Sequence, residues 1–217
     1  MIDATLKLIQ EHKLDPVVRW ILEHNTSQAL PYHSFNHALW VMFYSHKCYE
    51  SLPTRNDFSI DLLLAALFHD FHHSGGLFDD SKNIELAIAG FRQFHAANSR
   101  CKRSECYLSP IVYNIHEVEY LIKATEFPYD RTSLTGCAQA IRDADMMQNC
   151  NETGFNNLVE IRHKCFKHMG WDEYLEKFVA FFDGIRFYTA YGQDVGAKGI
   201  AKAKSRIETF RHLIASK

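Results

Sequence analysis

The chain contains 217 residues, a length suited to one domain with a sizeable hydrophobic core. Hydrophobic residues make up 47% and charged residues 23% of the sequence, the balance of an ordinary soluble globular protein. The formal net charge of −2 provides no field that would attract a long polyanion or an anionic membrane, so neither extended nucleic acid nor a membrane is expected as a partner.

The first residues lack the basic and apolar regions of a secretory signal, and the longest apolar run, Leu62 to Phe68, is too short to cross a bilayer. Six cysteines are scattered along the chain without the CxxC or CxxH spacing of a metal site. We therefore expect buried, reduced thiols and a cytoplasmic location.

Helical periodicity dominates the chain, and no run of alternating apolar residues is long enough to predict a sheet. Breakers such as Pro53, Pro128 and Gly170 separate the periodic segments. The sequence predicts an all-α fold, a single-domain helical bundle over residues 1–217, with helices near 3–12, 16–25, 36–51, 58–71, 81–97, 109–124, 135–148, 153–169, 171–191 and 197–215.

The first segment with candidate functional residues is YHSFNHA, residues 32–38. His33 and His37 are four residues apart, so a helix places them on one face, one turn from each other. His37 shares its helical stripe with Val41 and Cys48. This pattern predicts that His37 points toward the core.

The predicted helix 58–71 is apolar on every face from Leu62 to Phe68, which indicates a central, buried helix. It ends in His69-Asp70, and buried polar groups are costly unless they are paired. The helix dipole favours a cation at a helix C-terminus, so it accounts for a histidine but not for Asp70. A bound metal would satisfy both side chains.

A third segment, ending in Ala144-Asp145-Met146, contains two carboxylates. Asp145 follows Ile141 by four residues and lies beside Ala144, whereas Asp143 falls beside Gln139 on what we interpret as the polar face. Of the two, Asp145 is therefore the one predicted to point toward the core.

A single His-Asp pair is expected about once by chance in this composition, so the motif needs context. The three segments in order, Tyr-His-x-x-x-His-Ala, His69-Asp70-x-x-His73-x-Gly75 and Ala144-Asp145-Met146, resemble the HD-domain superfamily of metal-dependent phosphohydrolases. Within it, they are similar to cyclic-nucleotide phosphodiesterases and to small bacterial HD phosphohydrolases. The resemblance covers residues 32–146, and residues 150–217 carry no recognised motif.

The resemblance implies a helical bundle of the phosphodiesterase-like type with a metal bound by His37, His69, Asp70 and Asp145. Asp70 would also bridge to a second, mostly hydrated ion. Two imidazoles and two carboxylates suit Fe²⁺, Mn²⁺ or Zn²⁺ at the first site, with Mg²⁺ or Mn²⁺ at the second. Such ions lower the pKa of a bridging water to about 7 and supply a hydroxide that attacks phosphorus.

The same resemblance implies roles for three further side chains. His33 occupies the position of the general acid, a task that suits histidine near neutral pH. His73 matches a histidine beside the second metal and the phosphate. Glu85 resembles a carboxylate that orients a metal ligand or a metal-bound water.

Two departures from the family pattern bear on the substrate. His72 stands where the family has an acidic residue, and residues 150–217 contain no clear match to the purine clamp of cyclic-nucleotide phosphodiesterases. We therefore expect a phosphoester of a nucleotide or another small metabolite, without cyclic-nucleotide specificity. Two alternatives remain open: an HD-fold di-iron oxygenase with His95 and His116 as extra ligands, and a non-catalytic module that senses a nucleotide or metal.

Overall fold

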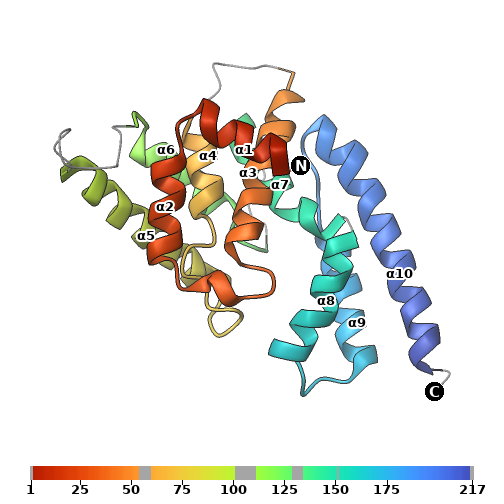
Figure 1. Cartoon of the computed structure of the whole chain (residues 1–217). Coiled ribbons are helices and arrows are strands. Elements are labelled where there is room, and N and C mark those ends of the chain that lie inside the picture. Colours follow the sequence, from red (N-terminus) through yellow and green to blue (C-terminus); the bar gives the residue numbers. More distant parts are fainter. Residues whose placement is uncertain (1, 54–59, 101–110, 129–133, 151, 216–217) are drawn as a thin grey trace.

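A computed structural model of the chain describes residues 2–53, 60–100, 111–128, 134–150 and 152–215 (Figure 1). Within these ranges the protein is helical and contains no strand, which confirms the predicted all-α class. None of the helices in this part of the chain is long and apolar enough to span a lipid bilayer. The α-helices are α1 (Ile2–Glu11), α2 (Asp15–His24), α3 (Phe35–Glu50), α4 (Ile60–Phe68), α5 (Asp80–Arg100), α6 (Ile115–Ala124), α7 (Gly136–Met147), α8 (Glu152–Cys165), α9 (Trp171–Gly184) and α10 (Ala197–Ala215).

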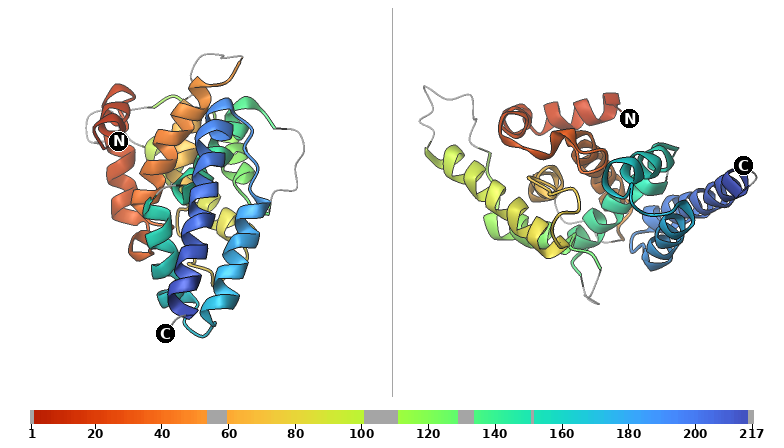
Figure 2. Two further views of the ribbon diagram at one scale, coloured as in Figure 1. Left: turned by 90° about the vertical axis from the view of Figure 1, so that its right-hand side faces the viewer. Right: turned by 90° about the horizontal axis from the view of Figure 1, so that it is seen from below.

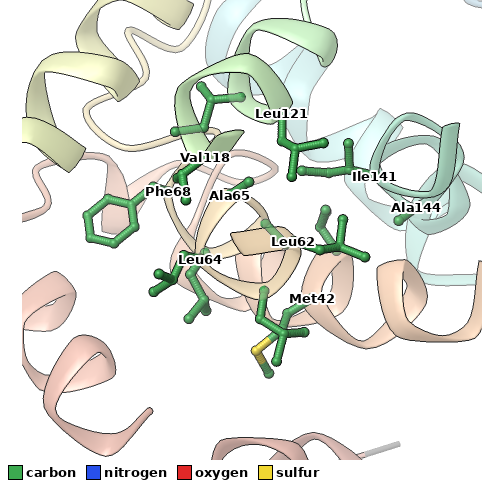
Figure 3. Close-up of a cluster of buried hydrophobic side chains, with 14 of the residues drawn as sticks. Met42, Leu62, Leu64, Ala65, Phe68, Val118, Leu121, Ile141 and Ala144 are labelled. Carbon is green, nitrogen blue, oxygen red and sulfur yellow. The ribbon is translucent and has the colours of Figure 1, made fainter. Parts of the chain in front are cut away.

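Helix α4 lies at the centre of the first hydrophobic cluster. Every residue from Leu62 to Phe68 is buried, as the apolar run predicts. Helix α4 packs against α3 and α6, and α7 packs against α3 and also contacts α4. Figure 3 shows α4 side chains surrounded by side chains of the three other helices, namely Met42, Val118, Leu121, Ile141 and Ala144.

The C-terminal helices α8, α9 and α10 form a second hydrophobic cluster, which includes Leu158, Leu175 and Ile207. Helix α10 packs against both α8 and α9, and Figure 2 shows the three helices grouped beside the remainder of the molecule. Because the buried apolar side chains divide into two clusters, the single-domain organisation of residues 1–217 stays a prediction.

The predicted helix 171–191 is wrong at its C-terminal end, because α9 stops at Gly184. The carboxylate of Asp143 accepts hydrogen bonds from the backbone N–H groups of Tyr188 and Thr189 at 2.8–3.0 Å and from the Thr189 hydroxyl at 2.7 Å. These N–H groups are therefore not available to continue a helix. A π-helical turn, η3 (Gly192–Gly196), then leads into α10.

The placement of Asp143 on a polar face is also wrong, since its side chain is completely buried. Periodicity alone missed this because α7 is covered on both sides, by α3 and by the segment before α10. Gly192 allows the close approach: a Cβ at this position would lie 2.3 Å from Asp143 Oδ2. Asp143 thus anchors the C-terminal segment to α7.

Most other helix boundaries lie within three residues of the predicted ones. The predicted helix 109–124 is wrong at residues 111–114, because the Asn114 side chain caps α6, which begins at Ile115, and the predicted helix 153–169 is too long, because α8 ends at Cys165. The predicted start at 58 lies outside the described residues.

Cys48, Cys137, Cys150 and Cys165 are free thiols, as expected. Only Cys48 is fully buried, and the other three are half-buried. Cys101 and Cys106 lie outside the described residues.

Candidate metal centre

Three helices bring the four predicted metal ligands together. His37 lies in the first turn of α3, His69 and Asp70 directly follow α4, and Asp145 lies in the last turn of α7. The Nε2 atom of each imidazole is 3.1–3.6 Å from one carboxylate oxygen of Asp70 and from one of Asp145. The two Nε2 atoms are themselves 3.2 Å apart.

The other ring nitrogen of each histidine is already bound. His37 Nδ1 faces the side-chain oxygen of Gln148 at 2.5 Å, and His69 Nδ1 faces the backbone oxygen of Ala66 at 2.9 Å. Since oxygens of this kind only accept hydrogen bonds, each Nδ1 carries the proton. In the neutral imidazoles both Nε2 atoms therefore present lone pairs toward the same space.

Two lone pairs that face each other at 3.2 Å repel, and two flanking carboxylates add negative charge. A cation at this point removes the conflict, either a proton on one imidazole or a metal ion. Donor atoms held about 2.1 Å from one ion lie about 3.0 to 3.4 Å from each other. His37, His69 and Asp70 each offer a donor atom within 4.8 Å of the other two, and Asp145 Oδ1 lies 3.1 and 3.6 Å from the two imidazoles, so these residues could hold a divalent metal. Gln148 and the Ala66 carbonyl would orient the two imidazoles.

The electrostatics of the cluster keep both carboxylates ionised. Burial alone raises the pKa of Asp70, but His33 and His69 outweigh it and hold that pKa well below its usual range. Burial alone also raises the pKa of Asp145, but His37 and His69 outweigh it and lower that pKa to about 2. Burial lowers the pKa of His69, yet the two carboxylates raise it well above its usual value. All of these shifts reflect a site that favours positive charge.

His33 and His73 form a second group around Asp70. One donor atom from each of the three residues lies within 4.8 Å of the others. His33 Nδ1 is 2.8 Å from Asp70 Oδ2, so this nitrogen donates a hydrogen bond to the carboxylate. The rings of His33 and His73 stack with their centroids 3.5 Å apart.

His73 has the opposite tautomer. Its Nδ1 accepts a hydrogen bond from the backbone N–H of Gly75 at 3.0 Å. Burial, and secondly the neighbouring His33, lower the pKa of His73 to about 4. A neutral His73 with Nδ1 as acceptor carries its proton on Nε2, so it offers a hydrogen-bond donor.

The cluster opens onto a cavity of about 410 Å³, whose lining includes His33, His69, Asp70 and Asp145. Asp80 and Asn83 of α5 also line it. The opposite wall is built by side chains that follow α6 and by α8, α9 and their connection. A volume of this size is typical of small-molecule sites.

The structure does not bring Glu85 to the cluster. Its side chain is 67% exposed and pairs with Lys82 at 2.7 Å. The inward residues of this turn are Asn83 and Ile84, and Asn83 accepts a hydrogen bond from the Ser74 N–H at 3.0 Å. Glu85 lies on α5, and the rotation of this helix directs its side chain outward.

The other predicted histidines lie elsewhere. His72 has a positive φ of 63° and its Nδ1 accepts a hydrogen bond from the Thr26 N–H, so it turns the chain and faces away from the ligands. His95 bonds the Tyr113 hydroxyl, and His116 is exposed on α6. The extra ligands considered for a di-iron enzyme are therefore not part of the cluster.

Sequence reasoning missed several residues that support the site. Gln148 orients His37, and Asn149 donates to the Tyr32 hydroxyl, which in turn donates to the Asp145 backbone oxygen at 3.2 Å. One signal was available: Gln148 follows Asp145 by three residues, which places it near the same face of a continuing helix. Asp80 gave no such signal.

No protein-family model matches the chain, and no similar protein is found among curated proteins or solved structures. The resemblance to the HD-domain superfamily therefore depends on the residues of the three segments. Their convergence in space is an independent observation.

Proposed function

We propose that this chain is a metal-dependent phosphohydrolase of the HD-domain type, with a divalent ion held by His37, His69, Asp70 and Asp145. The observation that carries the proposal is the pair of imidazole Nε2 atoms, 3.2 Å apart and flanked by two buried carboxylates. Polar groups from distant parts of the chain converge here without satisfying one another, unless a cation lies among them.

A divalent ion at this position supplies positive charge to a phosphoryl oxygen and acidifies a bound water. The protein contributes the charge that retains the ion, since Asp70 and Asp145 stay ionised. It also contributes orientation, because Gln148 and Ala66 fix the imidazoles that face the ion. The cavity beside the cluster provides room for the substrate.

His33 is suited to protonate the leaving group. Its Nδ1 donates to Asp70 Oδ2, which orients the ring and leaves Nε2 to carry the transferable proton. In the hydrolysis the oxygen of water forms a bond to phosphorus while the ester P–O bond breaks. The alcohol oxygen that departs takes its proton from His33 Nε2, and the proton of the water restores the acid.

His73 is suited to hold the phosphoryl group. Its Nε2–H is a neutral donor because Nδ1 accepts from Gly75. The rings of His73 and His33 stack, and this contact limits the rotation of both. His73 lines a neighbouring pocket that it shares with His33, rather than the cavity beside the cluster. We assign it to a hydrogen bond with a phosphoryl oxygen placed beside His33.

A substrate screen combined with elemental analysis tests the proposal. With Mn²⁺ added, the protein should release phosphate, or an alcohol, from at least one class of small phosphoester, including nucleotides. Bound iron with oxygen consumption and no phosphate release would indicate an oxygenase. Ligand-induced stabilisation without any turnover would indicate a sensor module.

A further inference from the structure

The cavity beside the metal centre has two unlike halves. Its polar lining includes the imidazoles of His33 and His69 and the carboxylates of Asp70, Asp145 and Asp80. The other half is apolar and is lined by Phe127, Ile161, Phe166, Met169, Phe178 and Phe181. Most of this apolar half comes from residues 161–181, the part of the chain without a recognised motif.

The apolar half is available to a ligand. Phe166, Phe178 and Phe181 are half-buried, whereas the central residues of the C-terminal cluster, such as Leu175, are fully buried. The ring of Phe181 packs against those of Phe127 and Phe178, with centroids 5.3 and 6.0 Å apart. These three rings therefore form one apolar wall in the lining of the cavity.

The two hydroxyl groups among these lining residues have committed their donors. The Thr125 hydroxyl donates to the Ile122 carbonyl at 2.8 Å, and the Tyr174 hydroxyl donates to the Leu158 carbonyl at 2.7 Å. Lys177 pairs with Glu173 at 3.2 Å, and its side chain is 62% exposed. A nucleobase in this half would exchange water for few hydrogen-bond partners, which disfavours it.

We infer that the cavity takes a phosphoester whose alcohol portion is aliphatic or aromatic, with the phosphate at the metal cluster and the alcohol portion against the wall of Phe166, Phe178 and Phe181. The reaction in this inference rests on the proposed function. The apolar contact is a property of the cavity and exists without turnover. The substrate is thus a phosphorylated apolar alcohol, and a nucleotide is the class it excludes.

Binding of alkylphosphonates tests the inference, because their P–C bond is not hydrolysed. In calorimetric titrations of the Mn²⁺-loaded protein, affinity should rise about fourfold for each methylene from methyl- to butylphosphonate. Butylphosphonate should also bind more tightly than adenosine 5′-monophosphate. A flat series, or tighter binding of the nucleotide, overturns the inference.

A variant in the apolar wall distinguishes the contribution of the apolar lining to binding from that of the metal cluster. Phe178→Ala should weaken butylphosphonate binding about tenfold while methylphosphonate binding changes less than about twofold. Phe210→Ala is the matched control, because Phe210 belongs to the C-terminal cluster but does not line the cavity. Equal losses for both phosphonates in Phe178→Ala would overturn the inference.

Phe178→Leu guards against a folding defect, since it keeps an apolar side chain and should retain most of the butylphosphonate preference. The phosphonate binding series also tests this inference independently of the proposed hydrolysis. A rising affinity with no hydrolysis of butyl phosphate or any other ester supports the apolar half and overturns the proposed function. Hydrolysis of small esters with a flat phosphonate series overturns only the inference.

Discussion

Helices α1–α7 and helices α8–α10 contribute to the same cavity in opposite ways. The first region supplies every imidazole and carboxylate of the candidate metal centre, on α3, α7 and the turn after α4. The second region supplies apolar side chains such as Phe166 and Phe178. Under the proposed function, the first region would carry the groups for chemistry, and the second would select what those groups act on.

The two regions also differ in how their role is encoded. Each candidate ligand of the first region is a polar residue at the end or on the inner face of a helix, among buried apolar side chains, a pattern that indicates a special environment. The wall of the second region consists of aromatic residues at ordinary helical spacing. Such residues are typical of any core, so only the structure distinguishes a cavity wall from buried packing.

The largest effect on activity is expected when a carboxylate of the candidate metal centre is removed from the first region. Asp70→Ala should lower kcat/KM about 10⁴-fold, because Asp70 contacts His33, His37 and His69 at once. Circular dichroism should show unchanged helix content. Asp79→Ala, an exposed acid of the adjacent loop, is the control and should keep activity. An Asp70→Ala protein with full activity would show that the metal assignment is wrong.

Removing the acid rather than a ligand should leave the metal in place. His33→Ala should lower kcat about 10³-fold for esters with poor leaving groups, since general acid catalysis contributes most when the departing oxygen is basic. Metal content should match that of the wild type. We would measure the rates with a series of aryl phosphates of different leaving-group pKa. Equal losses across that series would contradict the role of His33.

The anchor between the two regions should affect stability rather than chemistry directly. Asp143→Ala leaves the N–H groups of Tyr188 and Thr189 and the Thr189 hydroxyl without their acceptor. The free energy of unfolding should fall by about 3 kcal/mol, measured by urea denaturation. Glu176→Ala, on the exposed face of α9, should change it by less than about 0.5 kcal/mol. Similar values for both variants would mean that Asp143 is not an anchor.

The smallest effect is expected at Glu85. Because its carboxylate is exposed and pairs only with Lys82 among the contacts described, Glu85→Ala should change kcat/KM less than about twofold. Asn83→Ala, which removes the inward polar group of the same turn, should reduce it more. A large effect at Glu85 and none at Asn83 would reverse the assignment made from the helix rotation.

The sequence predicted the helical class and the central position of α4, because both depend on a local pattern of polar and apolar residues. The set of His37, His69, Asp70 and Asp145 came from the resemblance of three segments, and the structure brings these side chains together. The sequence did not predict the burial of Asp143, whose partners at 188 and 189 are 45 and 46 residues away along the chain. The same limit applies to Asp80 and to the aromatic wall. Their roles arise from contacts between helices, which periodicity within one helix does not encode.

The central claim is that a metal ion, and not a proton, lies between His37 and His69. Elemental analysis after incubation with Mn²⁺, Fe²⁺ or Zn²⁺ and removal of the free ion tests it most directly. We expect at least about one tightly bound ion per wild-type chain, and loss of that ion in His69→Ala. A wild-type chain that retains none of the three ions, with His69 protonated on both ring nitrogens in NMR spectra, would contradict the claim.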